Sequence, residues 1–320
     1  MNTKLTMGRM EWLLLGLLSV LWGGSFFFAR VALAEVAPLT LVLSRVVIAS
    51  AALGILLRAR GEALPHGKTL WATFFAMGFV NNLVPFSLLF WGQTHIGAGL
   101  ASIFNSLVPV FTVLLAHVFT SDEKLTSTKI GGVLLGAAGV VVMIGIDLGK
   151  GISGWTLLAM LACIAASFSY GIASVYGRRF AKLGIAPLNV AFGQVTASSV
   201  MMLPLVLVVD QPWNAIVPGT TSILAAAALG LFSTALAYVL FFRILARGGA
   251  TNISLVTLLI PVSAILLGAV FLNETLSTNH IAGMLLILLG LVALDGRTLR
   301  ALKRRKTVVC TDSTCTAGSS

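Results

Sequence analysis

Apolar residues gather along the chain in ten long runs that are separated by short polar stretches. Each run holds about 20 residues, the length that an α-helix needs to cross the hydrocarbon core of a bilayer. The runs predict membrane-spanning helices near residues 11–34, 38–58, 69–92, 97–120, 129–147, 153–176, 187–209, 220–243, 250–271 and 279–295. The expected fold class is therefore an all-α membrane protein with ten transmembrane helices.

Composition excludes a soluble protein. Hydrophobic residues make up 58% of the 320 positions and charged residues 10%, with a mean hydropathy of +1.01. Soluble domains carry about 25% charged residues. The net charge of +11 does not indicate a nucleic-acid partner, because the Lys and Arg residues lie between the apolar runs and in the segment 297–306. The three cysteines lack metal or disulfide spacing, and we expect no cofactor and no metal ion.

The basic residues also predict the orientation. With a cytoplasmic N-terminus, 18 of the 21 Lys and Arg residues fall on the cytoplasmic side, and the exceptions are Arg30, Arg45 and Lys150. Positive residues favour the cytoplasmic side, so we expect both termini there. The first run could also be a secretory signal with a cleavage site at residues 32–34, but its apolar stretch is longer than such signals have.

The second half of the chain repeats the first. The segment from Gly97 matches the segment from Gly249, and a weaker match pairs Trp22 with Tyr170 and Pro38 with Pro187. The stronger match pairs Pro109 with Pro261, Phe119 with Phe271, Glu123 with Glu274, Gly132 with Gly283 and Gly139 with Gly290. Each copy holds five spans, an odd number, so the second copy must enter the membrane from the opposite side. Inverted repeats of this kind build transporters whose halves enclose a site near the bilayer midplane.

The expected domains follow from this repeat. They are a cytoplasmic N-terminus over 1–10, a first five-helix repeat over 11–147, a second, inverted repeat over 148–296, and a cytoplasmic tail over 297–320. The tail is basic at first and then rich in Ser and Thr, a composition typical of disorder.

Several motifs resemble those of a known family. They are a W-G-G-S element at residues 22–25, an arginine in the second span at Arg45, and paired P…E…G signatures at Pro109, Glu123 and Gly132 and at Pro261, Glu274 and Gly283. Their combination resembles the EamA family of the drug/metabolite transporter superfamily, which includes exporters of aromatic amino acids. The resemblance covers residues 10–296. It implies a small-molecule exporter of the bacterial inner membrane, with a central cavity lined by spans one, three, four, six, eight and nine and with spans five and ten at the periphery.

Arg45 is the most informative charge. It lies seven residues past Pro38, which places it about 10 Å inside the outer membrane boundary at the helical rise of 1.5 Å per residue. Arg30 lies at a similar depth in the first span. Either arginine could bind a substrate carboxylate, and the alternatives are snorkelling to the interface or pairing with Glu35. The residue equivalent to Arg45 in the second half, Gln194, is neutral.

The other candidate cavity residues are polar or aromatic side chains inside spans, where polar groups are costly and often functional. They are Trp22, Asn81, Asn82, Pro85, Gln93, Asn105, Tyr170, Ser233, Tyr238 and Asn252. The alternative roles are hydrogen bonds between helices and ordinary packing. Pro109 and Pro261 lie in repeat-related helices and are candidate hinges; the alternative is a simple kink.

No Asp or Glu falls in the middle of a predicted span. Proton and sodium relays use such carboxylates, so we expect facilitated or exchange transport. We expect Glu123 and Glu274 to cap the helices that follow them. A nucleotide-sugar carrier or a drug and cation carrier of the same superfamily stays an alternative, while an intramembrane enzyme is disfavoured because the hydrolase and metalloprotease motifs are missing. The expected partners are a small-molecule substrate and the lipid bilayer; a monomer suffices, and a homodimer stays open.

Overall fold

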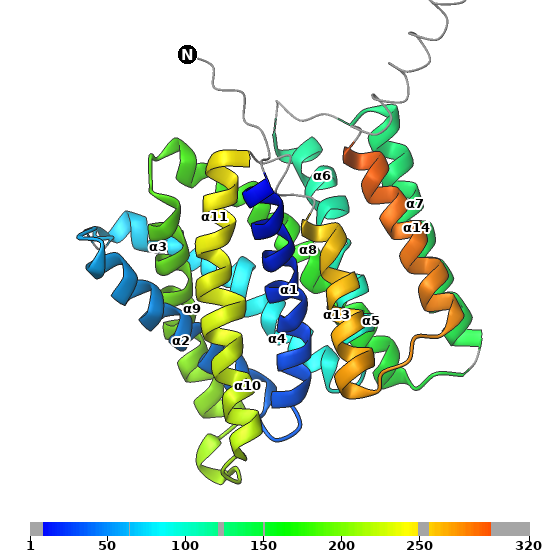
Figure 1. Ribbon diagram of the computed structural model, residues 1–320, viewed down its shortest axis with the longest axis horizontal. Coiled ribbons are helices and arrows are strands. Elements are labelled where there is room, and N and C mark those ends of the chain that lie inside the picture. The colour runs from blue at the N-terminus through cyan, green and yellow to red at the C-terminus, as the bar shows by residue number, and fades with distance from the viewer. Residues whose placement is uncertain (1–8, 64, 121–124, 150, 249–255, 296–320) are drawn as a thin grey trace, which may run out of the picture.

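The computed structural model describes residues 9–63, 65–120, 125–149, 151–248 and 256–295, and every regular element in these ranges is a helix (Figure 1). The α-helices are α1 (Arg9–Ala32), α2 (Pro38–Ala59), α3 (Lys68–Gly78), α4 (Val84–Gln93), α5 (Ala98–Asn105), α6 (Val108–Phe119), α7 (Ser127–Gly149), α8 (Gly154–Lys182), α9 (Pro187–Val209), α10 (Thr220–Gly230), α11 (Ala237–Gly248), α13 (Val256–Leu272) and α14 (Thr278–Asp295). Two π-helical segments, η1 (Phe79–Leu83) and η3 (Leu231–Leu236), join α3 to α4 and α10 to α11, and η2 (Pro212–Asn214) is a 3₁₀-helix.

The described helices are long and apolar enough for a multi-pass membrane protein. Eight helices, or runs of consecutive helices, have the length and hydropathy to cross a membrane, and shorter apolar helices cover residues 259–272 and 278–294. Each predicted span overlaps one of these segments. The all-α membrane class is thus confirmed.

Apart from the two spans that contain π-helical segments, two predicted spans differ clearly from the observed helices. α8 extends to Lys182, six residues past the predicted end, because Arg178, Arg179 and Lys182 continue the helix into polar surroundings and complement the negative end of its dipole. The fourth predicted span is not one helix but two, α5 and α6, which meet at Ser106 and Leu107. Pro109 follows this break, and proline has no amide hydrogen to continue the helical ladder.

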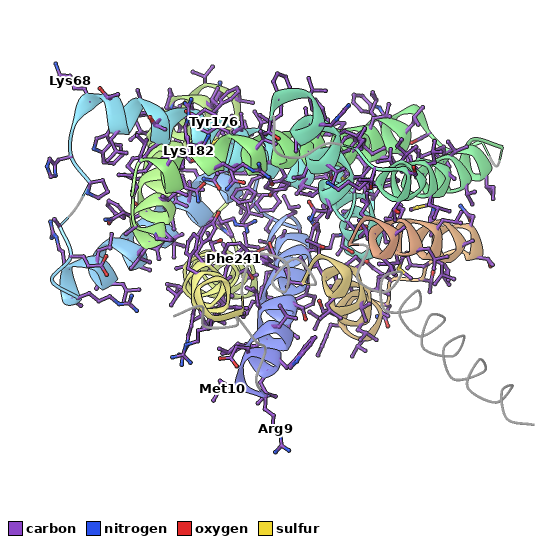
Figure 2. All side chains as sticks on the ribbon, turned by 90° about the horizontal axis from the view of Figure 1, so that it is seen from above. Arg9, Met10, Lys68, Tyr176, Lys182 and Phe241 are labelled. Atoms are coloured by element: carbon purple, nitrogen blue, oxygen red, sulfur yellow. The ribbon has the colours of Figure 1, made fainter. Side chains whose placement is uncertain are left out.

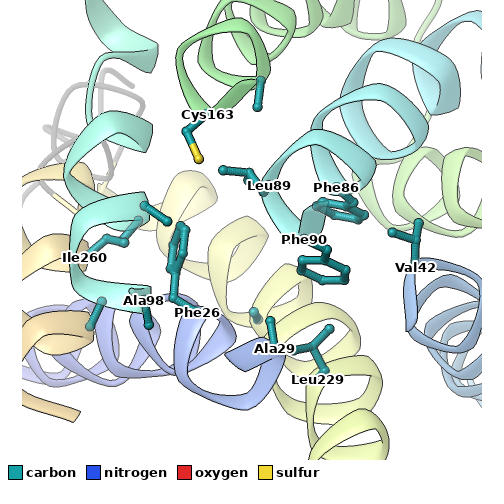
Figure 3. Close-up of a cluster of buried hydrophobic side chains, with 14 of the residues drawn as sticks. Phe26, Ala29, Val42, Phe86, Leu89, Phe90, Ala98, Cys163, Leu229 and Ile260 are labelled. Atoms are coloured by element: carbon teal, nitrogen blue, oxygen red, sulfur yellow. The ribbon is translucent and has the colours of Figure 1, made fainter. Parts of the chain in front are cut away.

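Helices from the two halves pack against one another. α1 lies against α13, α2 against α9, and α4 and α6 against α8. Their buried apolar side chains meet in one cluster, which includes Phe26 of α1, Val42 of α2, Leu89 of α4 and Leu229 of α10 (Figure 3). The main apolar core therefore lies between the two sequence halves.

α7 and α14 form an antiparallel pair at one edge of the bundle, as Figures 1 and 2 both show. Glycines let their backbones approach closely. A Cβ on Gly132 would lie 2.7 Å from the carbonyl oxygen of Gly290, and a Cβ on Gly139 would lie 2.6 Å from that of Gly283. Because Gly132 precedes Gly139 while Gly290 follows Gly283, the two helices run in opposite directions.

Candidate functional site

Arg45 is buried between the halves. It lies on α2 with 6% of its surface exposed. Its Nε donates a hydrogen bond to the Thr234 hydroxyl of η3 at 2.8 Å, and its guanidinium carbon lies 3.8 Å from the centroid of the Phe86 ring. It therefore neither snorkels to the interface nor pairs with Glu35. Among the described residues, no Asp or Glu forms an ion pair with Arg45.

Arg30 also has no pair with Glu35. Its Nη1 donates to the main-chain carbonyl of Gln93 at the end of α4. The carboxylate of Glu35 instead accepts a 2.7 Å hydrogen bond from the amide of Gly219. The alternative of an Arg30–Glu35 ion pair is therefore wrong, because Glu35 binds the start of α10.

Asn81 and Asn82 lie in the π-helical segment η1, and both contact α9. The Asn81 side-chain amide donates to the side-chain Oε1 of Gln194 at 2.8 Å and to the Tyr238 hydroxyl at 3.3 Å. The Asn82 amide donates to the Ser198 hydroxyl at 3.0 Å. These bonds form a neutral polar cluster against α9. The cluster includes Gln194, the residue equivalent to Arg45.

Pro85 follows this π-helical segment and leaves a carbonyl group without its helical partner. In a π-helical turn the amide of residue 85 would donate a hydrogen bond to the carbonyl of Val80, but proline has no amide hydrogen. The hydroxyl of Ser169 on α8 donates to this carbonyl at 2.7 Å. Irregular backbone at membrane depth is thus satisfied from a neighbouring helix.

The two halves bind in matching ways around η1 and η3. Gly78 precedes η1, and a Cβ there would lie 2.7 Å from the carbonyl oxygen of Gln194. Gly230 precedes η3, and a Cβ there would lie 3.1 Å from the carbonyl oxygen of Arg45. η1 therefore begins where its helix crosses α9 at Gln194, and η3 begins where its helix crosses α2 at Arg45. Gln194 and Arg45 are equivalent residues of the two halves.

Aromatic rings connect the remaining candidates. Tyr170 meets Phe86 edge to face, with 6.4 Å between ring centroids. Trp22 on α1 contacts Phe241, which contacts Phe242, which stacks on Tyr238, at centroid separations of 5.5, 5.2 and 6.2 Å. Figure 2 shows Phe241 where α11 meets α1. Rings from α1, α8 and α11 thus surround the polar groups.

The structure places the other candidates as follows. Ser233 in η3 is fully buried, and its hydroxyl has no hydrogen-bond partner within the described ranges. The side-chain oxygen of Asn105, the last residue of α5, is likewise unpartnered there. Pro109 follows the α5–α6 break, whereas Pro261 lies inside α13. Asn252 lies outside the described residues.

Three residues that the sequence analysis did not single out complete the site: Thr234, Phe86 and Ser198. Thr234 follows the candidate Ser233, and Phe86 follows the candidate Pro85. The sequence therefore indicated the right segments but not these two residues. Ser198 lies one helical turn after Gln194, on the same face of α9, but its contact with Asn82 has no local signature.

Three carboxylates between spans, which we call the loop carboxylates, each bind the first turn of a helix in the other half. Glu35 accepts from Gly219 at the start of α10. Asp210 accepts from the amide and hydroxyl of Thr40 in α2 at 2.6 and 2.8 Å. Glu274 accepts from the amides of Ala98 and Gly99 in α5 at 2.8 and 3.1 Å. Carboxylates are favoured at helix N-termini, so each one stabilises the contact between the halves.

One of the loop carboxylates corrects an expectation. Glu274 was expected to cap the helix that follows it, but its carboxylate binds the start of α5 instead. The local sequence allows either geometry, and only the fold brings α5 within reach. Glu123 lies outside the described residues.

The fold and the site define a polytopic helical membrane protein with polar and aromatic groups buried between two intermixed halves. The chain matches the EamA-like transporter family twice, over residues 10–145 and 157–294, and it belongs to this family. The repeated match coincides with the repeat in the sequence. The expected family is therefore confirmed.

Curated relatives carry transporter names. A probable terminal-alkyne amino-acid exporter of Streptantibioticus cattleyicolor is 29% identical over 88% of this chain and 91% of its own length. A probable amino-acid metabolite efflux pump of Salmonella typhimurium is 26% identical over 89% and 94%, and an uncharacterized transporter of Archaeoglobus fulgidus is 25% identical over 88% and 97%. These names describe transporters rather than enzymes.

A solved crystal structure has a similar fold. It aligns with a TM-score of 0.64 and 22% sequence identity, over 90% of this chain and 98% of that chain. The helical arrangement thus has a counterpart among solved structures.

Proposed function

We propose that the protein exports amino acids, aromatic ones among them, and related small metabolites by alternating access. In this proposal residues 11–147 and 148–296 are two inverted five-helix halves of a ten-span protein in the bacterial inner membrane, with both termini in the cytoplasm. The family and the names of two relatives support transport of this class. The distribution of Lys and Arg supports the orientation.

Matching contacts support the inversion. The glycine pair Gly132–Gly290 becomes Gly283–Gly139 when each residue is replaced by its repeat equivalent, and both pairs are close contacts. The equivalent helices α7 and α14 are antiparallel, as copies with opposite membrane polarity must be. The equivalent contacts of Gly78 and Gly230 follow the same rule.

The buried guanidinium of Arg45 is the observation that carries the choice of substrate. A buried cation is costly unless an anion or hydrogen-bond acceptors accompany it. Arg45 has Thr234 and the face of Phe86 beside it, but no ion pair with a carboxylate in the described ranges. A substrate carboxylate would supply the missing charge through a charge-assisted hydrogen bond. The rings of Trp22 and Tyr238 and their neighbours suit an apolar or aromatic side chain.

The loop carboxylates hold the two halves together at one end of the passage. In the proposed orientation Glu35, Asp210 and Glu274 all lie on the outer side, and each holds a helix of the opposite half. Alternating access requires the halves to separate at one end at a time. Opening toward the outside therefore requires these contacts to break.

Ion coupling is not part of this proposal. The sequence has no Asp or Glu in the middle of a span, where a proton or sodium relay would use one. We infer facilitated or exchange transport. Uptake that fails without an imposed pH or sodium gradient would contradict this inference.

The test uses the purified full-length protein in liposomes, with a panel of amino acids, nucleotide sugars and organic cations. We expect amino acid flux in the wild type and its loss in Arg45→Gln, while any cation flux survives. Arg243→Gln, at an exposed arginine of α11, is the matched control. Equal loss of all fluxes in Arg45→Gln would show a structural role, and nucleotide-sugar flux without amino acid flux would favour the alternative carrier.

A further inference from the structure

Gln93 is an anomaly among the buried polar residues. It is the last residue of α4 and is 0% exposed. Neither its side-chain oxygen nor its side-chain nitrogen has a hydrogen-bond partner within the described ranges. An unpaired buried polar group costs about 1–3 kcal/mol, so each such group in a folded protein calls for an explanation.

A cation binds the main chain of the same residue. The guanidinium of Arg30 donates to the main-chain carbonyl of the same residue, Gln93. Its sequence neighbour Glu35 is bound to Gly219, and no described carboxylate forms an ion pair with Arg30. One place at the outer end of α4 thus holds a cation, an unpaired donor and an unpaired acceptor.

The headgroup of an amino acid has the complementary set of groups. Its carboxylate can accept from the Arg30 guanidinium and the Gln93 Nε2, and its ammonium can donate to the Gln93 Oε1. A simple inorganic anion would leave the Gln93 oxygen unpaired. An organic cation would meet the positive charge of Arg30.

Gln93 lies on the same face of α4 as Phe86, whose ring contacts Arg45 of α2. Phe86, which stacks on Arg45, and Gln93 are seven residues apart, which is two helical turns and about 10 Å on one face of the helix. Phe90 lies between them, 2% exposed, with its ring centroid 5.8 Å from the Arg45 guanidinium. Figure 3 shows Phe90 beside Phe86, on the side toward Ala29 and Leu229.

We propose that Arg30 and Gln93 form a second, outer site for the amino acid headgroup, which the substrate occupies after leaving Arg45 and passing Phe90. The inference rests on the proposed function and adds the order of sites along the export path. Arg30 binds the carboxylate, and Gln93 binds both the carboxylate and the ammonium group.

The test measures the KM of L-phenylalanine from each side of the membrane, in liposomes where the protein orientation is known. The variants are Arg30→Gln, Gln93→Leu and Arg30→Lys, and the controls are Thr94→Ala and Arg243→Gln, at exposed residues. We expect Arg30→Gln and Gln93→Leu to raise the outer KM roughly tenfold, the usual effect of losing a charge-assisted hydrogen bond. The inner KM should change less than about twofold, and Arg30→Lys should recover part of the loss.

Headgroup analogues separate the two roles. Phenethylamine lacks the carboxylate and 3-phenylpropanoate lacks the ammonium group. As outer inhibitors of the wild type, both should be weaker than L-phenylalanine, and only 3-phenylpropanoate should lose further potency in Arg30→Gln.

Four outcomes would overturn the proposal. Equal changes of the inner and outer KM in Arg30→Gln would assign Arg30 a structural role. An unchanged outer KM in Gln93→Leu would mean that the amide binds only water. A wild type that carries no amino acid would end both this inference and the proposed function, whereas normal flux that depends on Arg45 but not on Arg30 or Gln93 would end this inference alone.

Discussion

Gly139 and Gly283 face each other so closely that a Cβ on either residue would lie 2.6 or 2.7 Å from the carbonyl oxygen of the other. Neither helix can accept even a methyl group here without moving. The contact fixes α7 against α14 at the edge of the bundle.

Gly139→Ala should therefore destabilise the protein by about 1–3 kcal/mol, the usual effect of overpacking. Gly131→Ala is the matched control, because a Cβ there has no atom within 4 Å. Thermal unfolding can be followed with a thiol-reactive dye at the buried Cys163, in a background where Cys310 and Cys315 are replaced by Ser. Equal melting temperatures for the two variants would contradict the close contact.

Phe86→Leu should weaken substrate binding without removing the charge of Arg45. The ring lies 3.8 Å from the guanidinium, and a desolvated cation–π contact contributes about 2 kcal/mol. We expect the KM for amino acids to rise by up to roughly thirtyfold, with kcat less affected. Phe119→Leu, at a residue that is 71% exposed, should leave both constants unchanged.

Glu274→Gln should loosen the contact at the start of α5. The carboxylate binds two main-chain amides, and the loss of a charged helix cap costs about 1 kcal/mol. A membrane-impermeant maleimide should then label Leu100→Cys, a buried position of α5, faster than in the parent. Glu62→Gln in the α2–α3 connection is the control, and unchanged labelling would argue against the cap.

The contact of Glu35 should persist to unusually low pH. Hydrogen bonds from the Ser222 side chain and the Gly219 amide hold the pKa of Glu35 below its ordinary value. Because the folded pKa is depressed, the contribution to stability is complete above the ordinary value of about 4.3 and is lost as the pH falls through the lower folded value. An infrared titration of the wild type minus Glu35→Gln should show the protonated carbonyl band only below that ordinary value.

The sequence predicted the membrane class and the family, since runs of about 20 apolar residues and a repeated P…E…G pattern are visible in neighbouring residues. It also singled out Arg45, because an arginine inside an apolar run is rare. It could not predict the partner of Arg45, since Thr234 is 189 residues away and its contact depends on packing. The sequence also could not predict which helix Glu274 binds, because α5 comes within reach of its carboxylate only in the folded protein.

The π-helical segments were also beyond sequence analysis. Hydropathy is the same whether a carbonyl group bonds four or five residues ahead, so FVNNL and LFSTAL look like ordinary helix. Each segment holds a polar pair, Asn81 and Asn82 in the first and Ser233 and Thr234 in the second, but such pairs also occur in regular helices and do not predict a π-helical turn.

Each π-helical segment holds one more residue than a regular α-helical turn, and one residue corresponds to about 100° of helical rotation. Deleting a single residue from Phe79–Leu83 would therefore restore a regular α-helical turn and leave Phe86 and Gln93 facing Arg45 and Arg30, whereas the same deletion within a regular helix would turn everything beyond it by that angle. Single-residue gaps in an alignment of relatives at this position would thus mark members that present the same face of α4 from an uninterrupted helix.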